Sequence, residues 1–473
     1  MDLKNKAMTW KVALAYALPN FGLAIMTGPI QGVLQGYYTK HFAITMAQIG
    51  GILFLARVID AVLDPVIGMV SDNVRDRFWG RRSWLVAGAS LSLLAVYHLL
   101  VVPPELTFAY CRLWIILGFI SWTISEIPYL AWGMELTSDY DDRTKIFSYK
   151  TALGFIGATL FLALPNIIAF YQIHMQGMAA DQITRDFSHT SMHVSFWLIA
   201  ITMPLFVGMA LWVCPGGSRV KRAERKSVGE ILRILFSNKA MLIFMGAFAI
   251  LGIAGGMQVA MAYLHVSVYL ALGESVSVIY TIGGLFFLLG VPFWNKFAAV
   301  KGKHVALITG LSLNVILFIA LGMLKPSHSG ALLGGRPLVF WEYMLIFCSL
   351  NFSQVVYFSM PPAIIGDIAE AATLETKEDQ SGTYFAVYTF VYKLVLGIGQ
   401  GLALFIAGSV FGFDPKVVEQ VDKAATGIKL MMGYMPAALV VVAIVVLIGY
   451  PITKKKQRET QEKIKELDLT VQD

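Results

Sequence analysis

Charged residues are scarce in this sequence. Asp, Glu, Lys and Arg make up 14% of its 473 residues, whereas soluble domains carry about 25%. Hydrophobic residues account for 57% of the chain, and the mean hydropathy is +0.67. This composition excludes an ordinary soluble domain and predicts a membrane protein.

Motifs for catalysis, phosphate binding and metal binding are also lacking. Cys111, Cys214 and Cys348 fall in or beside apolar runs without metal-site spacing, so we interpret them as packing residues. His189 and His193 have a helical metal spacing but no third ligand, which favours a surface loop. The chain contains no GxxxxGKS-type phosphate loop and no nucleophile–base pair. We therefore predict no enzyme activity and no cofactor, apart from a coupling ion that is either Na⁺ or H⁺.

The net charge of +7 does not indicate a nucleic-acid partner, because no soluble domain is present to bind one. The basic residues instead gather in short loops and in a lysine-rich tail; the loops read "VRDRFWGRR", "RTK", "GGSRVKRAERKS" and "KFAAVKGKH". Such loops stay in the cytoplasm. We therefore expect cytoplasmic termini in a plasma (bacterial inner) membrane, and a monomer whose partners are the bilayer, a small solute and the coupling cation.

The apolar runs are long enough to cross a bilayer as helices, which takes about 20 residues. We predict twelve of them, in two pseudo-symmetric six-helix halves, near 10–37, 45–71, 82–103, 106–134, 145–172, 193–214, 240–271, 275–299, 303–324, 338–366, 382–412 and 428–452. The predicted units are a first bundle, a cytoplasmic linker, a second bundle and a cytoplasmic tail: 1–215, 216–239, 240–452 and 453–473.

The two halves share a local pattern. "PYLAWG" (128–133) and "PPAIIG" (361–366) both read Pro-x4-Gly near the end of the fourth helix of their half. Each is followed by an acidic loop and then by a lysine, Lys150 or Lys393. A repeat of six helices is typical of secondary transporters, which bind substrate midway between the halves.

Two aspartates stand out in the second apolar run, "RVIDAVLDPVIGMVSD". Asp60 and Asp64 are four residues apart, so they project from one helix face. Pro65 frees a backbone carbonyl one turn back. Charges inside a bilayer are costly and usually functional, which predicts a cation site or a proton relay. Alternatively, Arg57 and the two acids neutralise one another as a buried cluster.

Other polar residues lie deep in apolar runs. Glu126 follows Thr123 by one turn and could complete a three-carboxylate site; otherwise it is a lone acid hydrogen-bonded to a neighbouring helix. Lys393 requires a carboxylate or an anionic substrate, unless it reaches the membrane surface. Asn20 is either a substrate contact or a packing hydrogen bond.

Aromatic residues mostly predict interface belts at the membrane surfaces. Tyr37, Tyr38, Trp132 and Tyr384 fit that interpretation. Another few could instead line a cavity and stack on a substrate: Tyr16, Tyr129 and Tyr357.

Several blocks resemble a known family. "GMVSDNVRDRFWGRR" resembles the signature loop of the major facilitator superfamily (MFS). "RVIDAVLDPVIGMVSD", "GMELTSDYDDRTKIFSYKTALGFIG" and "FAVYTFVYKLVLGIG" look like three blocks of its glycoside–pentoside–hexuronide:cation symporter family, and the pattern covers nearly the whole chain. The resemblance implies the MFS fold and a Na⁺, Li⁺ or H⁺ site at Asp60, Asp64, Thr123 and Glu126. It also implies a sugar path near Lys150, Lys393 and Trp132, and a gating loop at Gly68, Asp72, Gly80, Arg81 and Arg82.

The chain departs from that family at three places. Leu63 replaces a polar residue that sodium-using members often have between the aspartates, which leaves H⁺ as plausible as Na⁺. Gly22 replaces an acidic sugar ligand, and Pro361-Pro362 replaces a Pro-Trp pair. We therefore predict cation-coupled symport of a small polar solute, such as a sugar, glycoside, uronate or organic acid, by alternating access. The alternatives are a lysolipid or amphiphile transporter and a non-transporting membrane sensor.

Overall fold

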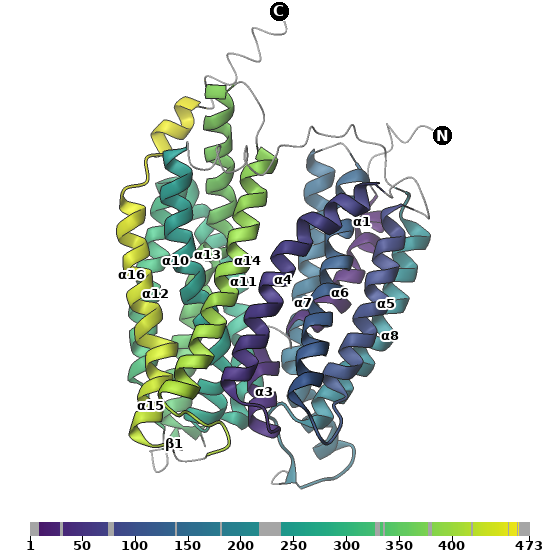
Figure 1. The fold of residues 1–473 in the computed structure, drawn as a ribbon, viewed down its shortest axis with the longest axis vertical. Coiled ribbons are helices and arrows are strands. Elements are labelled where there is room, and N and C mark those ends of the chain that lie inside the picture. The colour runs from purple at the N-terminus through teal and green to yellow at the C-terminus, as the bar shows by residue number, and fades with distance from the viewer. Residues whose placement is uncertain are drawn as a thin grey trace, which may run out of the picture.

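The computed structural model is almost entirely helical (Figure 1). Within its described residues, ten helices are long and apolar enough to span a membrane, and the strands are one short antiparallel pair, β1 (Leu332–Leu333) and β2 (Arg336–Pro337). The predicted all-α membrane class is therefore confirmed. The structure describes residues 9–28, 32–73, 80–137, 140–179, 182–216, 238–326, 332–333, 336–376, 381–417, 420–452, 454–460 and 462.

The first half of the chain occupies the six predicted spans 10–214. Its helices are α1 (Trp10–Ala17), α2 (Pro19–Gly28), α3 (Leu34–His41), α4 (Met46–Asn73), α5 (Arg81–Leu100), α6 (Phe108–Glu135), α7 (Tyr140–His174) and α8 (His189–Val213). The first span is divided among α1, α2 and α3. Pro19, which has no backbone N–H to donate, begins α2.

The second half repeats this arrangement. Its elements are α10 (Lys239–Leu264) with a π turn (His265–Tyr269), a 3-10 turn (Gly273–Ser275), α11 (Val276–Lys301), α12 (Lys303–Met323), α13 (Leu338–Thr376), α14 (Ser381–Phe405) with a π turn (Ile406–Val410), α15 (Asp422–Lys429), a π turn (Leu430–Tyr434) and α16 (Met435–Ile448). A short helix follows over 454–460. The predicted linker at 216–239 falls almost entirely outside the described residues, so the domain boundaries stay predictions.

The two halves stand side by side as separate bundles, and α4 of the first lies against α14 of the second (Figure 1). The α1 helix and the helix over 454–460 lie toward the same end of the molecule, which we call the terminus end. The α3 helix lies at the opposite end. The seam between α4 and α14 is therefore where side chains of the two halves can meet.

Glycine makes this close approach possible. A Cβ at Gly397 of α14 would lie 2.5 Å from the Cβ of Arg57 on α4, and a Cβ at Gly50 would lie 3.1 Å from the carbonyl oxygen of Gly401. Real Cβ atoms essentially never come as close as 2.5 Å. Larger residues at these positions would push the two halves apart.

An ion pair occupies the same place in each half. Arg81 begins α5 and donates from Nε to Glu135 at the end of α6, at 2.7 Å. Lys303 begins α12 and donates to Asp367 of α13, at 2.6 Å. The α5 and α6 helices are the third and fourth spans of the first half, and α12 and α13 are those of the second half. In each half the ion pair joins the two spans on the terminus side. The matching pairs support the internal repeat that the Pro-x4-Gly pattern predicts.

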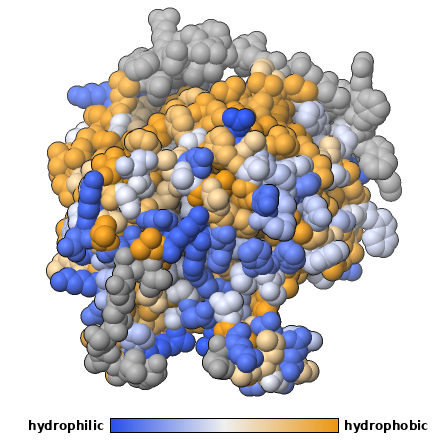
Figure 2. Space-filling view, turned by 60° about the horizontal axis from the view of Figure 1, so that its bottom comes forward, coloured by the Kyte–Doolittle hydropathy of each residue, from blue (hydrophilic) through white to orange (hydrophobic). Residues whose placement is uncertain are grey.

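The surface agrees with a bilayer environment. Figure 2 shows apolar side chains over the flanks, while hydrophilic ones gather on the end opposite the terminus end. Trp212 is 87% exposed, as expected for a side chain that faces lipid. The prediction that Tyr37, Tyr38, Trp132 and Tyr384 form interface belts is wrong, because all four are buried inside the bundles.

Candidate ion-coupling site

Two aspartates of the first half meet a lysine of the second half at the seam. Asp60 and Asp64 lie one turn apart on α4, as their spacing predicts. The Nζ atom of Lys393 on α14 lies 2.5 Å from Asp64 Oδ2 and 3.1 Å from Asp60 Oδ2. Lys393 is buried, so it does not reach the membrane surface. A tethered ammonium therefore occupies the carboxylate pair.

A second cation belongs to the same cluster. The guanidinium of Arg57 lies 3.8 Å from Asp60 Oδ2 and 4.6 Å from the ring centre of Phe119. With Asp64 and Lys393, the cluster holds two positive and two negative formal charges, which cancel. The expected neutralisation of the acids is thus present, but the closer partner of the acids is Lys393 rather than Arg57. Neutrality explains how so many charged groups tolerate burial.

The α6 helix supplies the third wall of the cluster. The hydroxyl of Thr123 donates a hydrogen bond to Asp60 Oδ1. The ring of Trp122, one residue earlier, lies 5.1 Å from the ammonium of Lys393, which suits a cation–π contact. Of the four predicted cation ligands, the structure therefore brings Asp60, Asp64 and Thr123 together.

Glu126 has a different partner. Its Oε1 atom lies 2.7 Å from the Nζ of Lys150 on α7, and that ammonium lies 5.2 Å from the ring centre of Tyr129. Asn20 donates to the carbonyl oxygen of Lys150 at 2.8 Å. Among the residues described, no three acidic, His or Cys side chains are placed to hold one metal ion. The three-carboxylate arrangement is therefore not formed in this conformation.

The Lys393–Asp64 and Lys150–Glu126 ion pairs each use one carboxylate oxygen and leave the other without a hydrogen-bond partner among the described residues. Asp64 Oδ1 and Glu126 Oε2 are buried and have no hydrogen-bond partner in the described part of the chain. Buried polar atoms are nearly always paired, and free carboxylate oxygens are the ligands that small hard cations or protons require. Asp60 and Asp64 therefore fit a coupling ion chemically. The role of the four predicted ligands stays a prediction.

Two residues predicted to contact the substrate, Tyr129 and Trp132, form hydrogen bonds within the first half. The Tyr129 hydroxyl donates to the carbonyl oxygen of Tyr16, and the Tyr16 hydroxyl donates to that of Tyr129 at 2.7 Å. Trp132 donates from Nε1 to the carbonyl oxygen of Pro215 at 3.1 Å. Tyr357 instead lines a pocket inside the second half. None of these placements tests substrate contact, which stays a prediction.

The predicted gating loop is described only in part. Arg81 donates to the hydroxyl of Ser71, near the end of α4, at 3.2 Å, in addition to its ion pair with Glu135. Arg82 donates to the carbonyl oxygen that ends α8, and Gly80 has a φ of 64°, which favours glycine. Gly68 accepts a local hydrogen bond within α4. The side chain of Asp72 and residues 74–79 lie outside the described residues.

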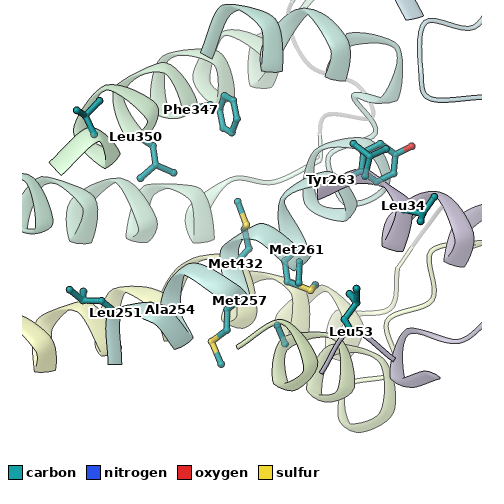
Figure 3. Close-up of a cluster of buried hydrophobic side chains, with 14 of the residues drawn as sticks. Leu34, Leu53, Leu251, Ala254, Met257, Met261, Tyr263, Phe347, Leu350 and Met432 are labelled. Carbon is teal, nitrogen blue, oxygen red and sulfur yellow. The ribbon is translucent and has the colours of Figure 1, made fainter. Parts of the chain in front are cut away.

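Sequence reasoning missed a polar network at the opposite end. Asp186, between α7 and α8, pairs with Lys40 of α3 at 2.6 Å. It also accepts hydrogen bonds from Tyr263 and Ser267 of the second half, at 2.9 and 2.8 Å. Figure 3 shows Leu34 next to Tyr263 at this junction. Isolated polar residues in separate elements carry no spacing signal, so only the fold could reveal this connection between the two halves.

A groove opens at the flank between α7 and α11. Its volume is about 1080 Å³, and its lining is mostly apolar, with Ala152, Phe155 and Ile156 on one side and Leu288 on the other. Ile156 is 52% exposed, so the groove faces the surrounding lipid. The groove runs along α7, the helix that carries Lys150. It lies between the two halves, because α7 belongs to the first half and α11 to the second.

Comparison with known proteins identifies the family. The model of the MFS/sugar transport protein family matches residues 15–454, nearly the whole chain. The chain belongs to this family. Because its members are transporters and not enzymes, the predictions of the MFS fold and of no enzyme activity are confirmed.

Individual relatives are distant but cover the full length. The chain is 21% identical to an uncharacterised symporter of Synechocystis sp., over 98% of both chains. It is also 21% identical to the sodium-dependent lysophosphatidylcholine symporter 1 of Xenopus tropicalis, over 92% of this chain and 86% of that protein. The crystal structure of the nucleoside transporter NupG superposes with a TM-score of 0.62 at 14% identity, over 93% and 98% of the chains. That similarity supports the fold.

Proposed function

We propose that this protein is a cation-coupled symporter that carries a small polar solute between its two halves by alternating access. The observation that carries the proposal is the ion pair of Lys393 with Asp60 and Asp64. It joins the halves at their seam, and it supports the proposal because its ammonium occupies the two carboxylates that a coupling cation would need. The symporters among its relatives support this reading.

The coupling step follows from charge. The seam cluster is neutral with Lys393 in place, so Na⁺ or H⁺ that binds the aspartates must displace the ammonium or share the carboxylates with it. The cluster then carries one excess positive charge. A displaced Lys393 is free to bind a carboxylate or a hydroxyl of the solute, and an anionic solute restores neutrality. Sugars, uronates and organic acids all present such groups.

Alternating access requires the opposite end to open. In the described conformation, Asp186 of the first half accepts hydrogen bonds from Tyr263 and Ser267 of the second half at that end. These two hydrogen bonds would break when the halves rock about the seam, whereas the Asp186–Lys40 pair lies within the first half. We further propose that the terminus end is cytoplasmic and that the protein lies in a plasma membrane, because basic loops border that end.

The deciding experiment is uptake into proteoliposomes. D-galactose and D-glucuronate are offered with an imposed Na⁺ gradient, a pH gradient, or neither, which also decides the coupling ion. Asp64→Asn should abolish gradient-driven accumulation. Asp367→Asn, which alters a similar Asp–Lys pair away from the seam, should keep it. Full gradient-driven uptake by Asp64→Asn would refute the proposal.

The lateral groove favours a second candidate function. The apolar groove runs along α7, the helix that carries Lys150, and it could hold the acyl chain of a lysolipid whose headgroup binds the Glu126–Lys150 pair. A lysophosphatidylcholine symporter among the relatives points the same way. Ala152→Trp fills the groove. It should abolish uptake of fluorescent lysophosphatidylcholine if the solute is an amphiphile, and should leave sugar or uronate uptake unchanged if it is not.

A further inference from the structure

A second pocket lies wholly inside the second half. It has a volume of about 150 Å³ and is enclosed by α10, α12, α13, α14 and α16. Its polar lining residues are Gln258, Asn314, Gln354, Tyr357 and Tyr392, and the lining residues that the structure describes include no charged side chain. Whole ligand sites usually measure about 300–1,000 Å³, so this pocket admits only part of a solute.

Packing explains some of these polar groups but not all of them. Gln354 donates to Gln258 at 3.0 Å, and Ser353 donates to Asn314. Such pairs are the usual reason for polar residues between membrane helices. The hydroxyl of Tyr357 differs: it is buried, and it has no hydrogen-bond partner in the described part of the chain. A hydroxyl left unpaired in an apolar bundle costs free energy.

Gly255 has no side chain, and it therefore leaves open the space beside the Tyr357 hydroxyl. A Cβ at Gly255 would lie only 3.4 Å from the Tyr357 oxygen. On the terminus side the pocket is bordered by aromatic rings: Phe248 stacks on Tyr357 at 5.8 Å between ring centres and lies tilted against Tyr388 at 4.9 Å. Aromatic faces of this kind suit the C–H face of a ring or another flat group.

The pocket adjoins the ion-coupling site. Tyr392, which forms part of its wall, directly precedes Lys393 on α14. A solute that reaches Lys393 can therefore extend an uncharged portion toward the pocket. The two regions divide the chemistry. The charged side chains lie in the ion-coupling site, whereas the polar groups of the pocket are uncharged amides and hydroxyls set among apolar side chains such as Leu251, Leu311 and Val440.

We propose that this pocket is the specificity subsite of the transporter and that it binds an uncharged, hydrogen-bonding portion of the solute, of the polyhydroxy or amide class. The inference rests on the proposed transport function. Tyr357 donates to a solute oxygen, and Gln354 and Gln258 bind neighbouring hydroxyl or amide groups. The pocket rejects a charged portion of the solute, because no side chain of opposite charge is among its described lining residues. It also rejects a purely apolar portion, because the Tyr357 hydroxyl and the glutamine amides would then lack hydrogen-bond partners.

The test measures solute binding to the intact chain. D-galactose, methyl α-D-glucoside, D-glucuronate and uridine are titrated against the purified protein, with binding followed by calorimetry and by the unfolding temperature. Tyr357→Phe and Gln354→Leu should each weaken binding of any bound solute about tenfold. Tyr343→Phe is the matched control: its hydroxyl on the same helix is also buried without a partner in the described chain, but it does not line the pocket. It should bind normally.

Stability distinguishes a binding role from a structural one. Removing an unpaired buried hydroxyl should leave the unfolding temperature of ligand-free Tyr357→Phe equal or higher, so weaker binding would not result from misfolding. Unchanged affinity in both pocket variants, or no binding of any of the four solutes to the unaltered protein, would overturn the subsite. If Na⁺ or H⁺ still drives uptake of D-galactose or D-glucuronate into proteoliposomes, the proposed transport of a polar solute survives the loss of the subsite. Gradient-driven uptake of fluorescent lysophosphatidylcholine alone would favour the amphiphile alternative, and if no gradient drives any uptake, the transport proposal fails.

Discussion

Replacing Lys393 with methionine tests the ion-coupling site most directly. Methionine keeps much of the length of the side chain but removes its charge, so the cluster changes from neutral to one excess negative charge. Asp64 loses its partner at 2.5 Å, and Asp60 keeps Arg57 at 3.8 Å as its charged partner, besides the hydrogen bond from Thr123. A mobile cation should then fill the place of the missing ammonium.

The size of the effect follows from the geometry. Across 2.5 Å, two unit charges attract by about 7 kcal/mol at an effective dielectric constant of about 20. Desolvation consumes much of this, so we expect about 2–3 kcal/mol to appear in cation binding, or a gain of about 30-fold to 150-fold in affinity. Without any cation, Lys393→Met should unfold more easily by about 3–5 kcal/mol, because a buried carboxylate is left unpaired.

The assay is the unfolding temperature of the purified protein against Na⁺, Li⁺ and pH, in a choline buffer. Lys393→Met should be destabilised in choline and rescued by one of these cations, yet it should not accumulate solute. Lys150→Met is the control, because it frees Glu126 in the same way. If only Lys150→Met gains a cation response, or if neither variant does, the assignment of Asp60 and Asp64 as the coupling site is refuted.

Three further predictions concern other parts of the fold. Asp186→Asn should weaken the closure opposite the terminus end, so that a cysteine placed at Ser267 reacts at least several-fold faster with a thiol reagent; an unchanged rate would exclude a gating role. Gly397→Ala should cost about 1–3 kcal/mol of stability by separating α4 from α14, while Gly51→Ala, which meets nothing within 4 Å, should not. Partial desolvation and Lys40 lower the pKa of His41, just beyond the first predicted span; stability should therefore fall as the pH drops below about 6.5, and His41→Gln should flatten that dependence in pH-dependent melting curves.

The sequence by itself determined the class of protein and the helices that carry its charges. Length and hydropathy of the apolar runs fix where helices cross a bilayer, because each span must satisfy its own backbone. The spacing of Asp60 and Asp64 placed them on one face, because α-helical geometry is local. The cost of burying Lys393 predicted a carboxylate partner without saying which one.

Only the tertiary structure decided the partners. Lys393 and Asp64 are 329 residues apart in sequence, and their pairing depends on how the two bundles dock, which Gly397 permits by having no side chain. Within the first half, the packing of α6 and α7 likewise pairs Glu126 with Lys150 rather than with the aspartates. Asp186 could not be linked to Tyr263 from sequence, since Asp186 lies in a connection and Tyr263 in a helix of the other half, and no spacing relates them. Spacing along one helix is written in the sequence, whereas contacts between helices depend on the packing of the whole chain.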